Sequence, residues 1–568
     1  MIVCYHVSNI FSAYLTAQLH AGEPQSITGI TSAGKYAGTK TTADLNKKPL
    51  LPIQNINEIK SLQSKIRHPL FKNTSLTLGF NFTAATVSNS AQTNVIPLNS
   101  TGYVGTRQYI LMTYQSVRSF DKITGLPDGI LNTDAASFFN TTPLDVRIQY
   151  DRFSKRWFAA AEVAGDGGPS STLVIAVSRD KVIVESTKWD FYYFDNATMM
   201  PQITPLGSGF LDYEQLAIDR YAVYNSVDTF DSQGNFFGTS TIVIPKKSLL
   251  AGNPVATVFP GIFPEDNLIL AEFIPPANNF DENPRFGYLI HASNQGFPSN
   301  TLYDTLYLYR IVNPASNKPT LVGPILITVP QYTEASNAPH KGNLYGSNGF
   351  LQTGIFGGLM TPHVRDKQLF ACHAIQVDQT GNANPNGDRV GVRWYQLDLT
   401  GDNSGQGGCS ENENTVPAVV QTGTLFDSQN AIDPLFYYVP SIMTNKKQDL
   451  VILSTVSGEN SFTNVSLATR KKKDPSGQLS NSLLATNNVA NSYNFGPLKN
   501  PSNGNIGQRW GDETSLCTDP LNDLDFWSTG QWAAVQNGWG VQVTQLLHGQ
   551  RRGISLSTKK SDHHSFHH

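Results

Sequence analysis

Near its C-terminal end the sequence reads RWGDETSLCTDP over residues 509–520, and Asp525-Phe526-Trp527 follow. A glycine and an acid precede a short alternation of polar and apolar residues from Ser515 to Thr518, which the pair Asp519-Pro520 stops. A second aromatic stretch begins shortly afterwards. This pattern predicts a strand, an acidic turn and a second, antiparallel strand.

The same pattern occurs twice earlier in the chain. Residues 211–219 (LDYEQLAID) carry an acid and a closing aspartate with the same spacing, and residues 144–151 (LDVRIQYD) repeat the pattern one residue shorter. A unit of short strands that recurs at intervals of tens of residues is typical of a radial repeat fold. We expect seven units, whose inner strands begin near Asn99, Asp145, Asp212, Arg285, Pro362, Tyr438 and Asp512.

The predicted fold is an all-β, seven-bladed β-propeller that is closed by an N-terminal strand. The seventh unit supplies three strands after Arg509, which is one short of a full blade. The stretch Leu76 to Thr83 alternates apolar and polar residues and precedes the first unit. Because an unpaired sheet edge favours aggregation, we expect this stretch to complete the seventh blade.

The chain divides into three predicted parts. Residues 1–70 form an irregular N-terminal extension with a short amphipathic helix between Ile56 and Ile66, and residues 71–547 form the propeller. A polar and basic tail, residues 548–568, is expected to be disordered. The opening stretch up to Ala21 is mildly apolar but lacks a basic start, so it is either an altered signal peptide or an ordinary disordered start.

Composition excludes several classes of partner. Charged residues make up 15% of the chain and the net charge is -3, so nothing favours a nucleic-acid partner. The basic run Arg470 to Lys473 is expected to be one solvated loop. No apolar run approaches the roughly 20 residues that a membrane-spanning helix needs. The four cysteines have no metal-ligand spacing, and one disulfide bridge remains possible.

The C-terminal motif resembles that of a family. Residues 509–512 (Arg-Trp-Gly-Asp), Asp519-Pro520 and Phe526-Trp527 are similar to the last blade of secreted bacterial propellers of the sialidase-like (BNR-type) superfamily. Glu513 and Thr514 depart from it, standing where that motif has tyrosine and serine. The resemblance covers roughly residues 95 to 547 and implies a propeller that is secreted or held at a cell surface. It implies no settled activity.

The inner-strand starts supply the candidate site residues. We expect the following six to face one end of the central tunnel: Asp145, Arg147, Asp212, Glu214, Arg509 and Asp512. The aspartates have two interpretations. They either accept hydrogen bonds from backbone N–H groups and tie blades together, or bind a cation such as Ca²⁺ through Asp145, Asp212 and Asp512.

Two functions fit these residues. The favoured one is an exported, monomeric binding or surface-interaction module without catalysis, whose ligand is a glycan or a protein. The alternative is a sialidase-like glycoside hydrolase, because Arg147, Arg285 and Arg509 stand at inner-strand starts and such an enzyme clamps a carboxylate with arginines. However, the Asp-box pattern Ser-x-Asp-x-Gly-x-x-Trp is absent, and no tyrosine–glutamate pair is expected beside the arginines. Four tryptophans are expected to be wedges between blades: Trp157, Trp394, Trp510 and Trp527.

Overall fold

The computed structural model describes two main ranges, 76–86 and 99–549, and two N-terminal strands at 25–28 and 41–44. Within the long range the gaps are 165–170, 201–208, 263–272, 294–300, 355–357, 404–414, 487–489, 501–503 and 506. The helix expected between Ile56 and Ile66 and the tail from residue 550 lie outside the described residues. Among the residues described, no helix is both long and apolar enough to cross a membrane.

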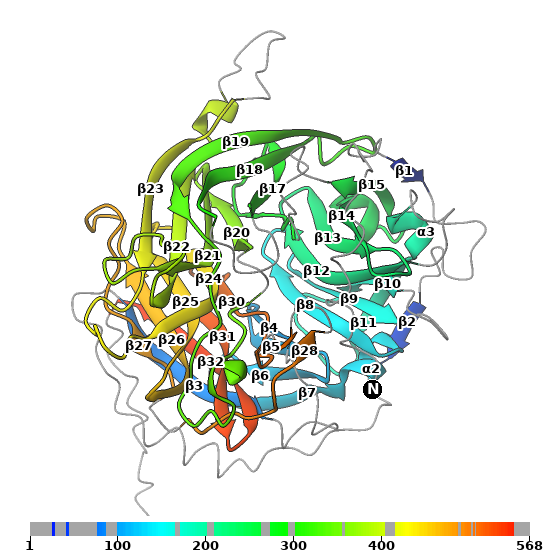
Figure 1. Cartoon of the computed structure of the whole chain (residues 1–568). Helices are drawn as coiled ribbons and strands as arrows, with labels where there is room; N and C mark the ends of the chain where they lie inside the picture. Colours follow the sequence, from blue (N-terminus) through cyan, green and yellow to red (C-terminus); the bar gives the residue numbers. More distant parts are fainter. Residues whose placement is uncertain are drawn as a thin grey trace, which may run out of the picture.

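The described chain forms seven antiparallel sheets that stand as blades around one axis (Figure 1), as predicted. The first three blades follow one another in sequence. Blade 1 contains β4 (Ser100–Val104), β5 (Gln108–Thr113), β6 (Ser116–Asp121) and β7 (Pro127–Asp134). Blade 2 contains β8 (Pro143–Asp151), β9 (Arg156–Ala164), β10 (Ser171–Ser178) and β11 (Lys188–Phe194). Blade 3 contains β12 (Phe210–Ile218), β13 (Ala222–Phe230), β14 (Phe236–Pro245) and β15 (Val255–Ile262).

Blades 4 to 6 continue the meander. Blade 4 contains β17 (Phe286–Ala292), β18 (Tyr303–Val312) and β19 (Thr320–Tyr332). Blade 5 contains β20 (Met360–Arg365), β21 (Gln368–Val377), β22 (Arg389–Asp398) and β23 (Ala418–Leu425). Blade 6 contains β24 (Phe436–Thr444), β25 (Leu450–Gly458), β26 (Ser461–Arg470) and β27 (Leu483–Leu484). Short helices occupy connections: α2 (Ala135–Phe139), α3 (Asn196–Met199), α4 (Lys246–Leu250), η4 (Gly346–Gly349) and η5 (Thr400–Asn403).

Blade 7 is closed from the N-terminus, as predicted. It contains β30 (Ser515–Thr518), β31 (Phe526–Val535) and β32 (Gly538–His548), and its outer strand is β3 (Leu76–Thr86). The register pairs Leu78 with Leu546 and Phe82 with Val543. An edge that would otherwise be open is therefore covered by a strand more than 400 residues away in sequence.

Two further N-terminal strands extend other blades, which sequence reasoning missed. Strand β1 (Gln25–Thr28) pairs with β15 at the outer edge of blade 3, and β2 (Thr41–Asp44) pairs with β11 at the outer edge of blade 2. A small two-stranded sheet, β28 (Lys499–Asn500) and β29 (Gly504–Asn505), lies in the connection between blades 6 and 7.

The expected start of the fourth inner strand, near Arg285, is wrong. Strand β17 is the second strand of its blade, because Pro276 bridges Leu289 in antiparallel fashion and the N–H of Ala277 donates to the carbonyl of Tyr288. The segment before β17 therefore forms the innermost strand, and its end, β16 (Asn278–Asn279), runs parallel to the inner strand β20 of blade 5. Two prolines in that segment obscured its strand character.

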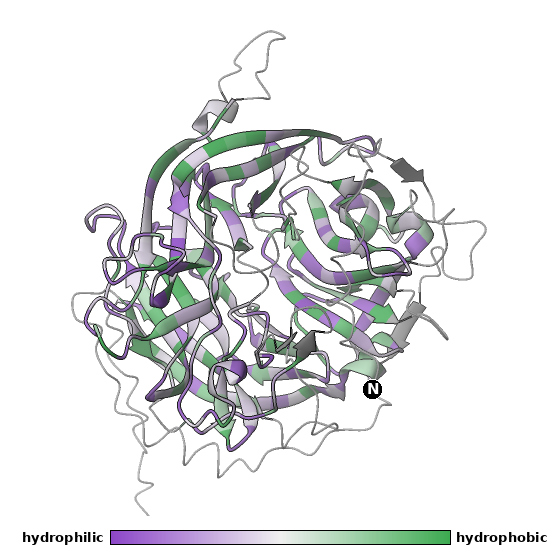
Figure 2. Cartoon of the chain, viewed as in Figure 1, coloured by the Kyte–Doolittle hydropathy of each residue, from purple (hydrophilic) through white to green (hydrophobic). Residues whose placement is uncertain are grey.

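The core consists of apolar layers between neighbouring blades, and apolar stretches occur in strands all around the ring (Figure 2). Strand β10 is apolar and buried without interruption from Leu173 to Val177, because both faces of its blade are covered. The four tryptophans are 0–2% exposed, which confirms them as wedges. The Trp527 ring of blade 7 stacks on Tyr109 of blade 1, with centroids 5.3 Å apart. A Cβ atom on Gly105 of blade 1 would lie 2.5 Å from the ring of Trp157 in blade 2, so this approach requires glycine.

The residues that end the inner strands form turns, as predicted for the closing aspartates. Asp219 accepts hydrogen bonds from the N–H groups of Tyr221 and Ala222, and Asn445 accepts one from Lys447. These turns join the first strand of a blade to the second, so they all lie at one end of the propeller, which we call the turn face. The inner strands begin at the opposite end, which we call the tunnel mouth.

Candidate functional site

Three carboxylates meet at the tunnel mouth. Asp145 comes from the inner strand β8, Glu162 from its neighbour β9 and Asp212 from the inner strand β12 of the next blade. Each offers one oxygen atom, and these atoms all lie within 4.8 Å of one another. Asp145 and Glu162 are buried, whereas Asp212 is partly exposed. This group has the composition of a site for a hard cation, which prefers several oxygen ligands.

A bulge in β12 brings blade 3 against these carboxylates. The pairing of β12 with β13 shifts register between Asp212 and Gln215, and Tyr213 adopts a left-handed backbone conformation with φ of 56°. The N–H groups of Tyr213 and Glu214 are thereby released from the ladder. That of Tyr213 is directed to the Asp145 carboxylate and that of Glu214 to Glu162, so each favours the charged form of the acid it faces.

The left-handed residue is a feature of the fold rather than of this site. Phe273, Thr361 and Val439 have positive φ values, between 44° and 82°, in the inner segments of blades 4, 5 and 6. Strain of this kind costs on the order of 1 kcal/mol or more per residue. Because the left-handed conformation also occurs at inner strands where no acids gather, it reflects how an inner strand begins and does not indicate a function.

Two arginines neutralise part of the acidic charge. The Nε atom of Arg147 lies 3.4 Å from a carboxylate oxygen of Glu214, and its guanidinium forms a close ion pair with Glu513. Arg509 forms an ion pair of 2.6 Å with Asp512. Blades 2, 3 and 7 are thus tied together at the tunnel mouth, because Arg147 bonds to residues of both other blades.

Burial and mutual repulsion shift the titration of the acids. Burial, reinforced by the neighbouring Asp145 and Asp228 carboxylates, raises the pKa of Asp212 to about 8. Burial raises the pKa of Asp512 to about 6, although Arg509 opposes this shift. For Glu162, burial and then the charges of Asp145 and Asp212 raise the pKa well above its ordinary value. These carboxyl groups cannot all be ionised at neutral pH unless further positive charge is present.

Glu162 is the least satisfied member of the group. Its side chain is fully buried, and neither carboxylate oxygen makes a hydrogen bond of normal geometry to any described residue. Among the largest influences on Glu162 from the described residues, the N–H of Glu214 is the one that favours the charged form. An unpaired buried carboxylate costs several kcal/mol unless it is protonated or meets a cation.

The structure brings the six predicted site residues together at the tunnel mouth. Asp145, Asp212 and Asp512 are close enough to repel one another. Glu162, rather than Asp512, joins Asp145 and Asp212 within ligand distance, because Asp512 is held by Arg509. Arg285 stands at the start of the second strand of blade 4, where it stacks over the Phe286 ring, and is therefore not a mouth residue.

Sequence reasoning missed Glu162 and Glu513. Glu162 is the single acid in the apolar stretch Trp157 to Val163, and such an isolated acid in an apolar strand was the available signal. Glu513 stands beside the predicted Asp512 and departs from the family motif. Both are inward-facing, at 0% and 1% exposure.

A tyrosine and a glutamate that are neighbours in sequence stand beside one arginine of the tunnel mouth, while the predicted absence of a tyrosine–glutamate pair beside an arginine cluster stays a prediction. Tyr213 and Glu214 both contact Arg147, whose guanidinium carbon lies 5.4 Å from the centroid of the tyrosine ring. The Tyr213 hydroxyl nevertheless lacks the properties of a nucleophile. The Tyr213 hydroxyl donates to the backbone carbonyl of Asp512 at 3.2 Å, and burial raises the pKa of this phenol. A tyrosine nucleophile requires the opposite shift.

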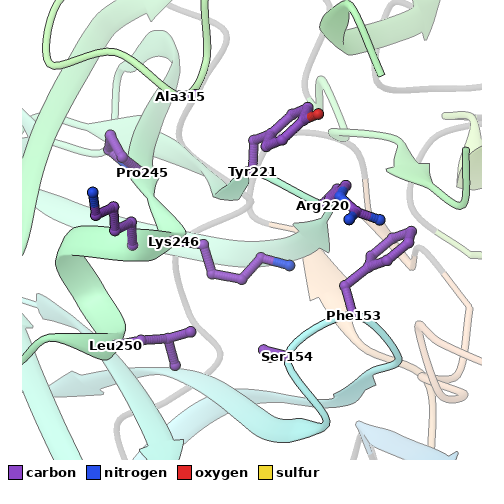
Figure 3. A pocket seen from close by; sticks show the side chains of 9 residues that line it. Phe153, Ser154, Arg220, Tyr221, Pro245, Lys246, Leu250 and Ala315 are labelled. Carbon is purple, nitrogen blue, oxygen red and sulfur yellow. The ribbon is translucent and has the colours of Figure 1, made fainter. Parts of the chain in front are cut away.

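A cavity of about 410 Å³ lies on the turn face, not at the tunnel mouth (Figure 3). Arg220 and Lys246 stand beside the ring of Phe153 in it. Two of its three cations are already neutralised, since Lys246 pairs with the buried Asp151 at 2.7 Å and Arg220 pairs closely with Glu282. We assign this cavity no ligand.

Comparisons with known proteins found similar solved structures but no family. No family model and no curated protein matches the chain. Similar solved structures include an apocarotenoid oxygenase mutant from Synechocystis, with 11% identity, a TM-score of 0.35, and coverage of 82% of this chain and 92% of that one. The Trypanosoma rangeli sialidase in complex with sialic acid has 11% identity and a TM-score of 0.30, covering 69% of this chain and 52% of that one. The WD40 domain of SCAP from fission yeast has 8% identity and a TM-score of 0.31, covering 90% and 98%.

The arrangement of its sheets defines the molecule as a seven-bladed β-propeller, and sialidases and a WD40 domain are among the similar solved structures. The chain spans about half the length of that sialidase. At such low identity and TM-score, these neighbours indicate neither a ligand nor an activity.

Proposed function

We propose that the protein is an exported, non-catalytic binding module whose tunnel mouth is held in shape by a divalent cation, with Ca²⁺ as the expected ion. The observation that carries this proposal is the meeting of Asp145, Glu162 and Asp212 within 4.8 Å, with both oxygens of the buried Glu162 unsatisfied. The ligand, a glycan or a protein, would meet the partly exposed Asp212 and Arg509 at the same end.

The donor set fits Ca²⁺ better than a transition metal. All three groups are carboxylates, which suit hard cations, and the described residues of the group include no histidine or cysteine. Three carboxylates offer up to six oxygen atoms, within the range of six to eight that Ca²⁺ takes. A bound cation would also relieve the repulsion that raises the pKa of Asp212. Calcium sites of extracellular modules have dissociation constants of roughly 10⁻⁴–10⁻³ M, which fits an exported protein.

The first prediction concerns stability as a function of pH and Ca²⁺. Because folding raises the pKa of Asp212 from its ordinary value near 4 to about 8, the folded protein binds more protons than the unfolded chain between these values. Without a cation, stability should therefore fall as the pH rises from about 4 to about 8. At pH 8, Ca²⁺ in about hundredfold excess over its Kd should add about 2–3 kcal/mol, and at pH 5 much less. Thermal unfolding with EDTA or Ca²⁺ measures both effects.

The matched variants are Glu162→Gln and Glu185→Gln, which make the same change at the buried site and at an exposed position in blade 2. Glu162→Gln should lose more than half of the Ca²⁺ stabilisation and should make the cation-free protein more stable at pH 8. Glu185→Gln should behave as the unchanged protein does. A Ca²⁺ effect of equal size in all three proteins would contradict the cation site.

A second candidate function is a sialidase-like hydrolase, because Tyr213 and Glu214 lie beside Arg147. The contacts that Arg147 makes, however, argue against this function. Arg147 is engaged by two glutamates, so it is not free to clamp a substrate carboxylate. Purified protein should therefore release no fluorophore from fluorogenic sialosides or other simple glycosides. Assays of the unchanged protein beside Asp212→Asn and Asp512→Asn measure this. Turnover that either substitution abolishes would overturn the non-catalytic proposal.

A further inference from the structure

A second feature lies on the turn face of blade 6, away from the tunnel mouth. A hollow of about 530 Å³ is lined by five lysines from two separate turns, and we call it the lysine hollow: Lys446, Lys447, Lys471, Lys472 and Lys473. The sequence shows Arg470 to Lys473 as one basic run, for which a solvated loop was expected. Folding brings a pair of lysines from the turn between β24 and β25 beside this run.

The backbone of the hollow is held firmly. The Asn445 side chain accepts hydrogen bonds from the N–H groups of Lys447 and Asp449, at 2.9 and 3.0 Å. In the other turn, the N–H of Lys471 donates to the Asp474 carboxylate at 2.8 Å, and Arg470 donates to the carbonyls of Lys471 and Asp474. The N–H of Lys472 donates to the Asp449 carboxylate at 3.4 Å, which joins the two turns, and four of the five lysine side chains are exposed.

The acids at the hollow do not neutralise these lysines. The Asp449 carboxylate lies 3.2 Å from Nε2 of His548, and Asp366 accepts a hydrogen bond from the Gln448 side chain at 2.9 Å. Within the described part of the chain, none of the five lysines forms an ion pair. In the cavity beside Phe153, by contrast, the buried Lys246 and the exposed Arg220 each have an acidic partner. Five ammonium groups around one hollow repel one another and attract an anion of matching extent.

We propose that the lysine hollow binds a linear anionic polysaccharide. The one ring among the lining residues is the imidazole of His548, which lies against the Asp449 carboxylate with its side chain 14% exposed, so it offers little surface for stacking on nucleic-acid bases. No arginine among the lining residues offers a planar fork for phosphate. The hollow is open to solvent, so an extended polymer can reach the lysines of both turns at once. Repeated single charges along a polysaccharide match the separate point charges of lysines from two turns. This site does not depend on the cation at the tunnel mouth.

The probe is dextran sulfate, with uncharged dextran of the same length for comparison, and the full chain is used in EDTA. Lys447→Gln, Lys472→Gln and Lys473→Gln together remove three charges from the hollow. The control combines Lys181→Gln, Lys188→Gln and Lys318→Gln, which removes three exposed charges from blades 2 and 4. Fluorescence anisotropy at about 0.1 M salt should show about a tenfold loss of affinity in the hollow variant and less than a twofold loss in the control, because surface charges act mainly within about 10 Å at that ionic strength.

Other outcomes would overturn the proposal. Equal losses in the two triple variants would show attraction to net charge without a site. A third variant replaces Arg551, Arg552, Lys559 and Lys560 with glutamine. If this variant alone abolished binding, the C-terminal segment and not the hollow would bind the polymer. Vesicles of anionic phospholipid that bind more tightly than dextran sulfate, with loss in the hollow variant, would show the hollow to be a lipid site.

Discussion

A chain that lacks residues 1–90 should fail to stay soluble, whereas one that lacks residues 1–70 should fold. The longer deletion removes β3, and with it the burial of Leu76, Leu78 and Phe82 against blade 7. At about 1.5–3 kcal/mol for each large apolar side chain, this loss is comparable to the whole stability of a typical domain. It also exposes the edge of β32 along its full length. Soluble yield and light scattering after expression measure the effect.

The shorter deletion is the matched control, and it has a smaller expected effect of its own. It removes β1 and β2, which pair with four residues each at the outer edges of blades 3 and 2. Those blades keep all four of their own strands, so a lowering of Tm by a few degrees is expected. Equal solubility and equal Tm for the two truncated chains would contradict closure by β3.

Replacement of Trp510 by alanine should lower the free energy of unfolding by about 3–5 kcal/mol, as truncation of a large core aromatic does. Trp510 is 2% exposed, and its ring meets Tyr493 edge-on with centroids 4.8 Å apart. Its Nε1 atom donates to the Thr455 hydroxyl of blade 6 at 3.3 Å. Trp510 lies just before blade 7 in the sequence and contacts blade 6, so alanine would leave a cavity between these two blades.

Denaturant titration of Trp510→Ala measures this loss. Ile432→Ala is the control, because Ile432 is 96% exposed and its truncation should change stability by less than about 0.5 kcal/mol. A loss below about 1 kcal/mol for Trp510→Ala would show that the ring is not a wedge.

The architecture was predictable from local patterns. Strand alternation and acidic turns are repeated in every well-marked unit, so the positions of β8, β12, β24 and β30 followed from spacing alone. Closure by β3 was predictable because one strand was left over and one blade was incomplete. The predicted start of the inner strand of the fourth blade was wrong for a local reason. Pro275 and Pro276 lie in its inner segment, and proline weakens the sequence signal of a strand.

The candidate site was predictable only in part. Asp145, Asp212 and Asp512 could be placed at one end of the axis because they occupy equivalent positions in repeated units. Their partners could not be placed. Glu162 comes from a second strand rather than an inner one, and its approach to Asp212 depends on the bulge at Tyr213. A bulge changes which backbone N–H groups leave the ladder, and sequence spacing does not reveal it.

The sequence by itself determined the repeat, the turn residues and the wedge positions, because each of these depends on neighbours a few residues away along the chain. The tertiary structure alone decided which charges meet. Arg147 finds Glu214 and Glu513 in two other blades, and Lys446 and Lys447 come to lie beside Lys471 to Lys473. Such pairings join residues tens or hundreds of positions apart. Electrostatic energy depends on the distance between charges and on their burial, and both are fixed only when the ring of blades closes.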